Sequence, residues 1–480
     1  MIAAIQTLIA ANYLEPRGFG TFAIVSIAAM MASICGPGFL GAASREVPHY
    51  LSLGNEEKAR SVINHVAYGE LAVAVGWTAA IAIFSLVQDN TQLAPLLLIV
   101  AISVVPAKAI GVFQLLAYRE KNFDLQSKVD LSRAVVTALL VISLIWVFGI
   151  YIVLLAPVVA NLIGTALYAR KYRLAFDVKA LRMAEFTRLA GIGLPITGAN
   201  IVNSMSGLQR WAERLLVHSF LGMSALGIYA FSNWIALTLM TLSGSIMQAL
   251  QPHVYDVMSR GLDEKEIQSY LLRPMWVFAI GGALLFGFCA AMFPDLVAGF
   301  LAPYASGIPV MQCLLFAAYL NCIYWVPAIM IYAVSFNGQF YYFLICSIGV
   351  LVSVLAAAAL LHAGMDALAV AIGFVLSQLL VGCLTFARVW QYLFPAPGAA
   401  LRFFGSMVVP LLNVSIAIVA IHYYSGLLAS LPGSWSVHLL AAAGKGMAFL
   451  AISIPAIALL ERKTGIYREH LQPFCARFLR

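Results

Sequence analysis

The chain has 480 residues, of which 62% are hydrophobic and only 10% are charged, and its formal net charge is +8. Soluble proteins carry about 25% charged residues, so this composition excludes a large water-soluble domain. The positive charge does not indicate nucleic-acid binding either, because no basic patch is interleaved with a soluble fold.

Fourteen apolar stretches follow one another along the chain. Most approach the roughly 20 residues that a bilayer helix needs, and continuous apolar runs exclude a barrel, whose strands would alternate. The first stretch would reach only about 20 Å at about 1.5 Å per residue, so we expect the true start to lie upstream and the first helix to be truncated. The predicted spans are 2–13, 21–40, 67–87, 93–118, 134–148, 151–168, 189–219, 225–250, 274–293, 311–333, 341–361, 368–389, 403–423 and 437–460.

Lys and Arg gather in alternate gaps between these spans and in the C-terminal tail. The positive-inside rule then places those gaps and the C-terminus in the cytoplasm. Four basic residues break the pattern by falling inside spans: Lys108, Arg210, Arg214 and Lys445. We interpret Lys445, between Gly444 and Gly446, as the sign of a late helix start.

A short internal repeat divides the chain. Residues 14–23 join the first two spans and residues 221–230 join the seventh and eighth; both read Leu, five residues, Gly, any residue, aromatic, Ala. An offset of six spans gives both copies the same orientation, as in transporters built from two matching lobes. We therefore predict an all-α polytopic membrane protein of about 14 transmembrane helices. A first six-helix lobe would occupy 1–180 and a second 181–397, with a terminal helix pair and basic tail at 398–480.

The seventh and eighth spans carry polar stripes. Asn200, Asn203, Arg210 and Arg214 recur at helical spacing in the seventh span, and Thr241 and Gln248 belong to the stripe of the eighth. A polar stripe facing lipid is costly, so these side chains face either a wet cavity between the lobes or each other in a packed bundle. We favour the cavity.

Two of the in-span cations allow two interpretations each. Arg210 and Glu213 can pair three residues apart and leave Arg214 as a net positive charge, which suits phosphate; alternatively Arg210 is an anchor at the outer interface. Lys108 lies about ten residues inside its helix with no acid evident nearby, whereas Glu70 lies near the start of its own helix. We therefore interpret Lys108 as a cavity cation rather than as a residue that extends to the membrane surface.

Signals of an enzyme are absent from the sequence. The external gaps hold only scattered acids, and we find no paired carboxylates for acid–base work, no Walker A sequence and no zinc spacing. We therefore expect no catalytic residues, no metal and no cofactor.

Residues 13–22, which read Tyr-Leu-Glu-Pro-Arg-Gly-Phe-Gly-Thr-Phe, resemble the "Leu-Gly-Pro-Glu-Gly-Phe-Gly" junction of bacterial polysaccharide and oligosaccharide flippases. The stretch from Glu213-Arg214 through Leu221-Gly222 to residues 225–229, followed by Pro252, resembles the second junction of that family. Glu15 stands where the family usually has Gly, and Glu213 stands where it has Asp. The resemblance places the chain in the multidrug/oligosaccharidyl-lipid/polysaccharide exporter superfamily.

The resemblance implies a flippase that moves undecaprenyl-diphosphate-linked oligosaccharides to the periplasmic leaflet of the bacterial inner membrane by alternating access. The product would feed O-antigen (lipopolysaccharide), capsule or exopolysaccharide assembly, and the partners would be membrane lipids, a polysaccharide polymerase and chain-length machinery. On this hypothesis Arg210, Arg214 and Lys108 hold the diphosphate, while Asn200, Asn203, Thr241 and Gln248 contact sugar.

Two other hypotheses remain. A cation-coupled antiporter of the multidrug and toxin extrusion type would need acids in the first lobe, and the sequence shows no mid-span acid there. A membrane glycan polymerase or ligase would need a large external loop with catalytic charges, and the external gaps are too short for one.

Overall fold

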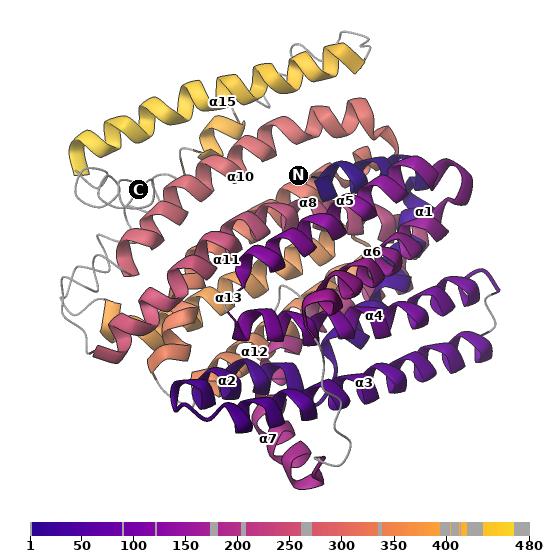
Figure 1. Ribbon diagram of the computed structural model, residues 1–480. Helices are drawn as coiled ribbons and strands as arrows, with labels where there is room; N and C mark the ends of the chain where they lie inside the picture. The colour runs from indigo at the N-terminus through magenta and orange to yellow at the C-terminus, as the bar shows by residue number, and fades with distance from the viewer. Residues whose placement is uncertain are drawn as a thin grey trace. The chain divides into compact units, whose positions relative to one another are not determined.

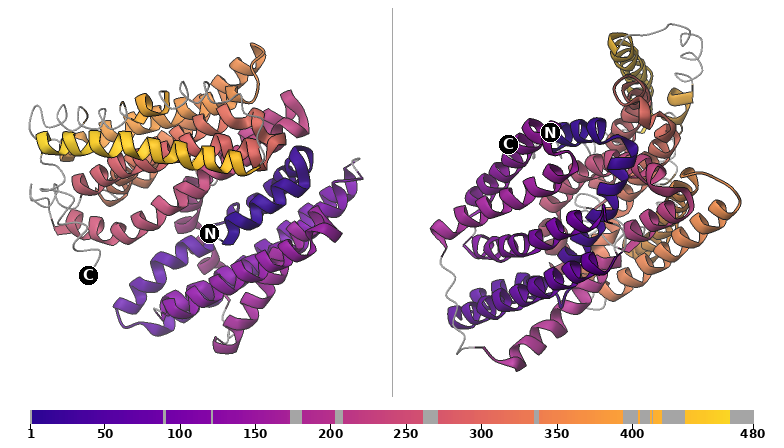
Figure 2. Two further views of the ribbon diagram at one scale, coloured as in Figure 1. Left: turned by 90° about the horizontal axis from the view of Figure 1, so that it is seen from above. Right: turned by 90° about the vertical axis from the view of Figure 1, so that its right-hand side faces the viewer.

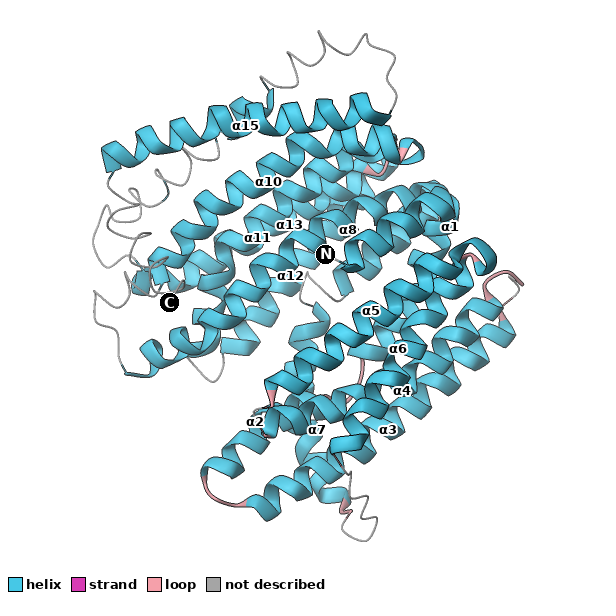
Figure 3. Ribbon diagram, turned by 45° about the horizontal axis from the view of Figure 1, so that its top comes forward, coloured by secondary structure: helices cyan, strands magenta, loops and turns pink. Residues whose placement is uncertain are grey.

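The structure is a computed structural model that describes residues 2–88, 91–120, 122–172, 181–202, 208–260, 271–334, 338–393, 404, 412, 414–419 and 435–464. Across these residues the regular structure is entirely helical, without a strand, as Figure 3 shows. Within the described ranges, eleven segments are long and apolar enough to cross a membrane, judged by length and composition. The prediction of an all-α polytopic membrane protein is confirmed, whereas most of the predicted thirteenth span (403–423) lies outside the described residues.

The chain forms two compact units, Met1–Gly227 and Ile228–Arg480, and α8 runs from the first into the second. The division into lobes at 180 and 397 stays a prediction. The helices of unit 1 are labelled in Figure 1: α1 (Ile2–Ile34), α2 (Phe39–Ser52), α3 (Glu56–Val87), α4 (Ala94–Arg119), α5 (Phe123–Phe148), α6 (Ile150–Lys171), α7 (Met183–Val202) and the start of α8 (Leu208–Arg260).

Unit 2 holds the rest of α8 and a set of long helices. Its helices are α10 (Arg273–Phe300), a short 3-10 turn at Ala302–Gly307, α11 (Ile308–Val334), α12 (Gly338–His362), α13 (Leu368–Leu393) and α15 (Trp435–Thr464). Helix α13 packs against both α11 and α12, and α15 packs along α10.

Capping residues start two helices of unit 1. The side chain of Asn55 accepts a hydrogen bond from Lys58 N at the start of α3, and Asn122 does the same for Leu125 N in α5. Each cap satisfies a backbone N–H that has no partner within the helix. Helix α3 therefore begins at Glu56, eleven residues before the start predicted from hydropathy.

The core of unit 1 lies between long helices that run side by side. Helix α3 packs against α4, and α5 against α6, and Figure 2 shows these purple helices as neighbouring rods. One buried cluster joins Val25 of α1, Ala74 of α3 and Leu97 of α4. Large apolar side chains such as Phe84 and Val147 are exposed on the outside, which suits a surrounding of hydrocarbon rather than water.

The two copies of the sequence repeat share one backbone conformation. Helix α1 is interrupted at Glu15 (φ 54°, ψ 173°) and α8 at Gly222 (φ 83°, ψ −174°), which occupy the same place in the repeat, one residue after Leu14 and Leu221. This region of backbone space is accessible to glycine and strained for other residues. Among the described residues, Glu15 is the one non-glycine with a positive φ.

The two copies also touch each other inside unit 1. A Cβ at Gly20 would overlap the carbonyl oxygen of Met223, and a Cβ at Gly227 would overlap the carbonyl oxygen of Pro16. Small residues at such a point let two backbones approach closely, which stabilises helix pairs in membranes. The glycine of the shared motif is therefore a packing residue in both copies.

Candidate functional site

The second predicted span is broken near its C-terminal end. Helix α1 ends at Ile34, residues 35–38 are not helical, and α2 begins at Phe39 after Gly38 in the left-handed conformation (φ 79°). The sequence here is Cys-Gly-Pro-Gly, and proline removes a backbone donor while glycine permits the positive φ. The expectation of one continuous helix over 21–40 is therefore wrong.

The break is packed against α7. A Cβ on Gly38 would collide with the carbonyl oxygen of Gly193, and a Cβ on Gly193 would collide with that of Gly38. Thr197 of α7, one helical turn before Asn200, lies against Gly38 and is buried. In addition, the indole Nε1 of Trp77 donates to the carbonyl oxygen of Cys35 at 2.8 Å, so the unwound backbone is held from two sides.

A buried ion pair lies at this break. The Nζ of Lys108 in α4 is 2.9 Å from Oε2 of Glu70 in α3, and the two side chains are 10% and 5% exposed. Lys108 also donates to the carbonyl oxygen of Ser33 at 3.2 Å, and Glu70 Oε1 accepts from the backbone N–H of Leu40 at 3.3 Å. The pair thus bridges the last turn of α1 and the first turn of α2.

The charges of the pair match the dipoles of the two helix ends that flank residues 35–38. The C-terminal end of a helix carries partial negative charge and the N-terminal end partial positive charge. The ammonium of Lys108 lies at the C-terminal end of α1, and the carboxylate of Glu70 lies at the N-terminal end of α2. Helix ends bind cations and anions in the same way in discontinuous membrane helices.

Two expectations about this region are wrong. Lys108 does have an acid beside it, and Glu70 lies deep within α3 because that helix begins at Glu56. Hydropathy placed the start of the span too late, whereas the capping sequence Asn55-Glu56-Glu57 was the signal that would have placed Glu70 inside the helix. Glu70 is the residue of this site that the sequence interpretation missed.

The charge cluster at the start of α8 is tied to α1. Arg214 Nη1 donates to the carbonyl oxygen of Ala23 at 3.1 Å and to Ser26 Oγ at 2.9 Å. Glu213 is 1% exposed, and Arg210 is half-buried on the same helix. This cluster and the ion pair at the break both lie in unit 1.

Of the four predicted sugar-contacting residues, the side chain of Thr241 alone is among those that the structure describes. Thr241 is exposed on α8 and its Oγ1 donates to the carbonyl oxygen of Thr238 at 2.7 Å. Asn200 and Gln248 have helical backbones in α7 and α8, but their side chains are outside the described residues, and so is Asn203 altogether. Their proposed contacts with sugar stay predictions.

Lys445 also has a carboxylate partner. Helix α15 begins at Trp435, so the interpretation of Lys445 as a late helix start is wrong. Its Nζ lies 2.8 Å from both carboxylate oxygens of Asp295 in α10, with side chains 19% and 17% exposed. This pair joins two helices of unit 2 and involves no break in either.

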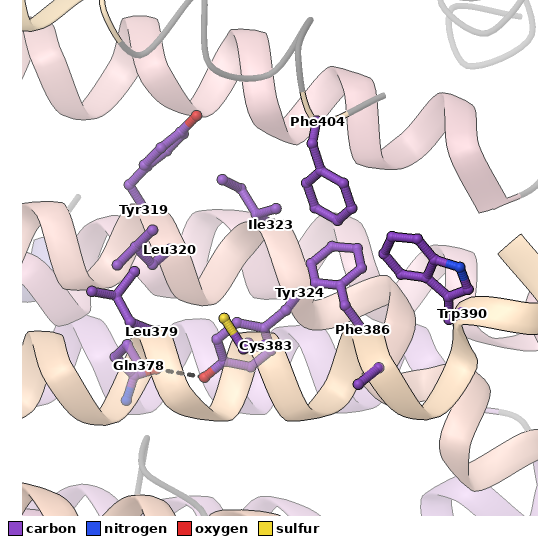
Figure 4. Close-up of a pocket in the computed structure, with 12 residues that line it drawn as sticks. Tyr319, Leu320, Ile323, Tyr324, Gln378, Leu379, Cys383, Phe386, Trp390 and Phe404 are labelled. Carbon is purple, nitrogen blue, oxygen red and sulfur yellow. Dashed lines mark hydrogen bonds between the residues drawn. The ribbon is translucent and has the colours of Figure 1, made fainter. Parts of the chain in front are cut away.

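Unit 2 contains an apolar cavity of about 450 Å³. It lies between α11 and α13 and is closed on one side by Phe404, whose ring stacks with Trp390 and meets Phe386 edge to face (Figure 4). Two lining residues, Tyr324 and Gln378, form a buried hydrogen-bonded cluster with Asn321, and the dashed line in Figure 4 marks the Tyr324–Gln378 bond. The cavity walls offer almost no polar surface.

In the part of the chain that the structure describes, no group of three or more His, Cys, Asp or Glu side chains is placed to hold a metal ion.

The fold is that of known membrane transporters. A multidrug resistance MATE family transporter of the MOP superfamily, in an inward-facing conformation, aligns with a TM-score of 0.69 and 12% identity over 82% of this chain and 94% of its own. The lipid II flippase MurJ aligns with a TM-score of 0.67 and 12% identity over 96% of this chain and 98% of its own. A MOP superfamily transporter from Pyrococcus furiosus aligns with a TM-score of 0.61 and 12% identity, over 82% and 92% of the two chains.

The sequence itself identifies the family. The family profile described as "Polysaccharide biosynthesis protein" matches residues 1–258, more than half of the chain. The chain therefore belongs to the polysaccharide biosynthesis protein family, as the junction motifs predicted. No curated protein matches the sequence.

Proposed function

We propose that the chain is a flippase that moves an undecaprenyl-diphosphate-linked oligosaccharide from the cytoplasmic to the periplasmic leaflet of the bacterial inner membrane, with its own C-terminus in the cytoplasm. The observation that carries this proposal is the family match over 1–258. The similarity to a lipid II flippase over 96% of this chain supports it, since the multidrug transporters align with 82%.

Substrate chemistry supports the same proposal. Sugar hydroxyls without partners cost a few kcal/mol each in hydrocarbon, so a protein must supply polar groups along the path. Arg210 and Arg214 would hold the diphosphate, because the guanidinium fork suits phosphate oxygens. Lys108 is engaged by Glu70, so we assign it a smaller share of that binding than the sequence suggested.

The apolar cavity of unit 2 would accept part of the polyprenyl chain. An apolar cavity of about 150 Å³ holds one benzene, so 450 Å³ would hold about 18 carbon atoms. Its position between two membrane-spanning helices puts it within reach of lipid. A polysaccharide polymerase and chain-length machinery would receive the product, and no step of this function requires the chain to act as an enzyme.

Complementation tests this function. In a strain that lacks its own flippase for the matching glycan, the wild-type chain should restore surface glycan. The double variant Arg210→Ala/Arg214→Ala should reduce export at least about tenfold at equal protein level, since two charge-assisted contacts are lost. Arg60→Ala, an exposed residue at the start of α3, is the matched control and should export normally. Full export by the double variant would overturn the cation role, and no export by the wild type would overturn the function.

A cation-coupled antiporter of the multidrug and toxin extrusion type is the second candidate. The buried Glu70 supports it, because such an antiporter needs an acid among its first helices. Efflux of cationic dyes from cells that express the chain, without glycan export, would favour this candidate over the flippase.

A further inference from the structure

The nitrogen of Lys108 contacts oxygen atoms from two different helices. These are a carboxylate oxygen of Glu70 at 2.9 Å and the carbonyl oxygen of Ser33 at 3.2 Å. A carboxylate together with a carbonyl at the end of a half-helix is the donor set that broken membrane helices offer to monovalent cations. Lys108 and Glu70 are buried at 8% and 4% exposed, whereas Ser33 is an exposed residue.

These oxygens are held in place without Lys108. Glu70 Oε1 accepts from Leu40 N at the start of α2, where the helix dipole favours a negative charge. The carbonyl of Ser33 belongs to the last turn of α1, and the break that follows is fixed by Trp77 through Cys35. The positions of the two oxygen atoms therefore depend on α1, α2 and α3, whereas the ammonium group belongs to α4.

We propose that Lys108 is the tethered occupant of a monovalent cation site formed by Glu70 and the carbonyl of Ser33 at the break of the second span. The chain carries its cation covalently at this point and takes none from solution. Removal of the side chain beyond Cβ opens the site to a free cation, and the best occupant is n-propylammonium, which has the same three carbons and ammonium group. The inference does not depend on which substrate the protein transports.

The test is chemical rescue of Lys108→Ala, purified in detergent and followed by thermal unfolding. Loss of the ammonium leaves a buried carboxylate unpaired, so we expect the melting temperature to fall by at least about 5 °C. Propylammonium chloride should restore it with a saturable dependence on concentration. Tetramethylammonium chloride at equal ionic strength should not, because that cation is too wide and donates no hydrogen bond. The same variant is also measured in sodium chloride and in potassium chloride. A saturable rise of the melting temperature in either salt also supports the proposal.

Two variants control the test. Glu70→Gln/Lys108→Ala lacks the charge of the site and should not respond to propylammonium. Lys445→Ala leaves Asp295 unpaired on an unbroken helix, without the carbonyl of a half-helix, and should respond much less.

Equal melting temperatures of Lys108→Ala in propylammonium and tetramethylammonium, with no effect of sodium or potassium, would overturn the proposal. So would an equal response from Lys445→Ala. If Lys108→Ala does not accumulate, the yield of folded protein from cells grown with and without propylammonium gives the same answer: a higher yield with the amine supports the site, and an equal yield overturns it.

Discussion

Lys108 and Glu70 hold opposite charges 2.9 Å apart and are both buried, and each also contacts the backbone beside the break at 35–38, Lys108 at the end of α1 and Glu70 at the start of α2. Burying two charges costs free energy because both lose their contacts with water. Removing only one of the two side chains destabilises the protein strongly, because the other charge is left buried without a partner. Its stability contribution can therefore be measured in a double-mutant cycle.

We expect Glu70→Gln and Lys108→Met each to lower the free energy of unfolding by about 3–5 kcal/mol, since either change leaves one buried charge without its partner. The double variant should lose clearly less than the sum. Unfolding by denaturant in detergent measures both quantities. Lys128→Ala, which breaks an exposed pair with Asp124, is the control and should cost no more than about 0.5 kcal/mol. Additive losses in the cycle would show that the two side chains are not coupled.

Glu15→Gly should stabilise the protein by about 1 kcal/mol. The backbone at Glu15 (φ 54°, ψ 173°) is in a region that costs other residues about 1–3 kcal/mol, and part of the relief is offset because glycine has more freedom in the unfolded chain. Thermal unfolding measures the change. Glu15→Ala removes the carboxylate but keeps the strain, so it should give no gain; an equal gain would assign the effect to charge.

Gly20→Ala should destabilise the protein by about 2 kcal/mol or more, because the added Cβ overlaps the carbonyl oxygen of Met223 and the helices must separate. Gly227→Ala should behave alike. Gly76→Ala is the control: nothing lies within 4 Å of its added Cβ, and alanine favours the helix by up to about 1 kcal/mol. The three variants are compared by thermal unfolding, and similar values for all three would contradict the close approach.

The carboxyl group of Glu185, at the start of α7, makes the free energy of unfolding depend on pH. Hydrogen bonds from Arg188 lower the pKa of this carboxyl below its usual value, and Arg188 also contacts Glu46 of α2. A group with a lowered folded-state pKa contributes stability above its unfolded pKa of about 4.3 and loses it as pH falls through the folded value. Because Arg188 is partly exposed, we expect no more than about 1 kcal/mol.

Unfolding at neutral pH and near pH 3 tests this contribution. Arg188→Met should reduce stability at neutral pH and make the acid-induced loss smaller, since the carboxyl then titrates nearer its ordinary value. An unchanged difference between the two pH values would assign the acid sensitivity to other groups.

Cys383→Trp should reduce glycan export several-fold with an unchanged protein level. Cys383 lines the cavity of unit 2 and is exposed, so the indole would fill space that we propose for a polyprenyl chain without disturbing the buried core. Leu376→Trp places the same ring on an exposed position of α13 that does not line the cavity, and it should export normally. Normal export by both variants would exclude the cavity from the path of the chain.

The sequence predicts the helical class and the two junctions, because both follow from local patterns: apolar runs long enough to span a bilayer, and a repeated motif with Gly222 in one copy. Helices α4 and α6 continue through Pro106 and Pro157, as expected for membrane helices. The break at 35–38 also has a local signal, the sequence Gly36-Pro37-Gly38. A hydropathy average over a span-length window does not detect it.

The partner of Lys108 is not a local property. Glu70 meets it only because α3 begins early and is rotated so that this residue faces α4, and rotation about a helix axis depends on packing along the whole helix. The same holds for Arg214, whose contacts with Ala23 and Ser26 depend on how α8 crosses α1. Sequence patterns single out the unusual cations, whereas their neighbours are set by tertiary structure.

The contact between Gly20 and Gly227 has an evolutionary consequence. Equivalent positions of a duplicated segment usually diverge independently, because each copy acquires its own surroundings. Here the two copies contact each other, because Gly20 packs against the backbone of Met223 and Gly227 packs against the backbone of Pro16. A larger residue at either position therefore requires the opposite backbone to move away. We expect related chains to change at these two positions together or not at all, because each glycine contacts the backbone of the other segment.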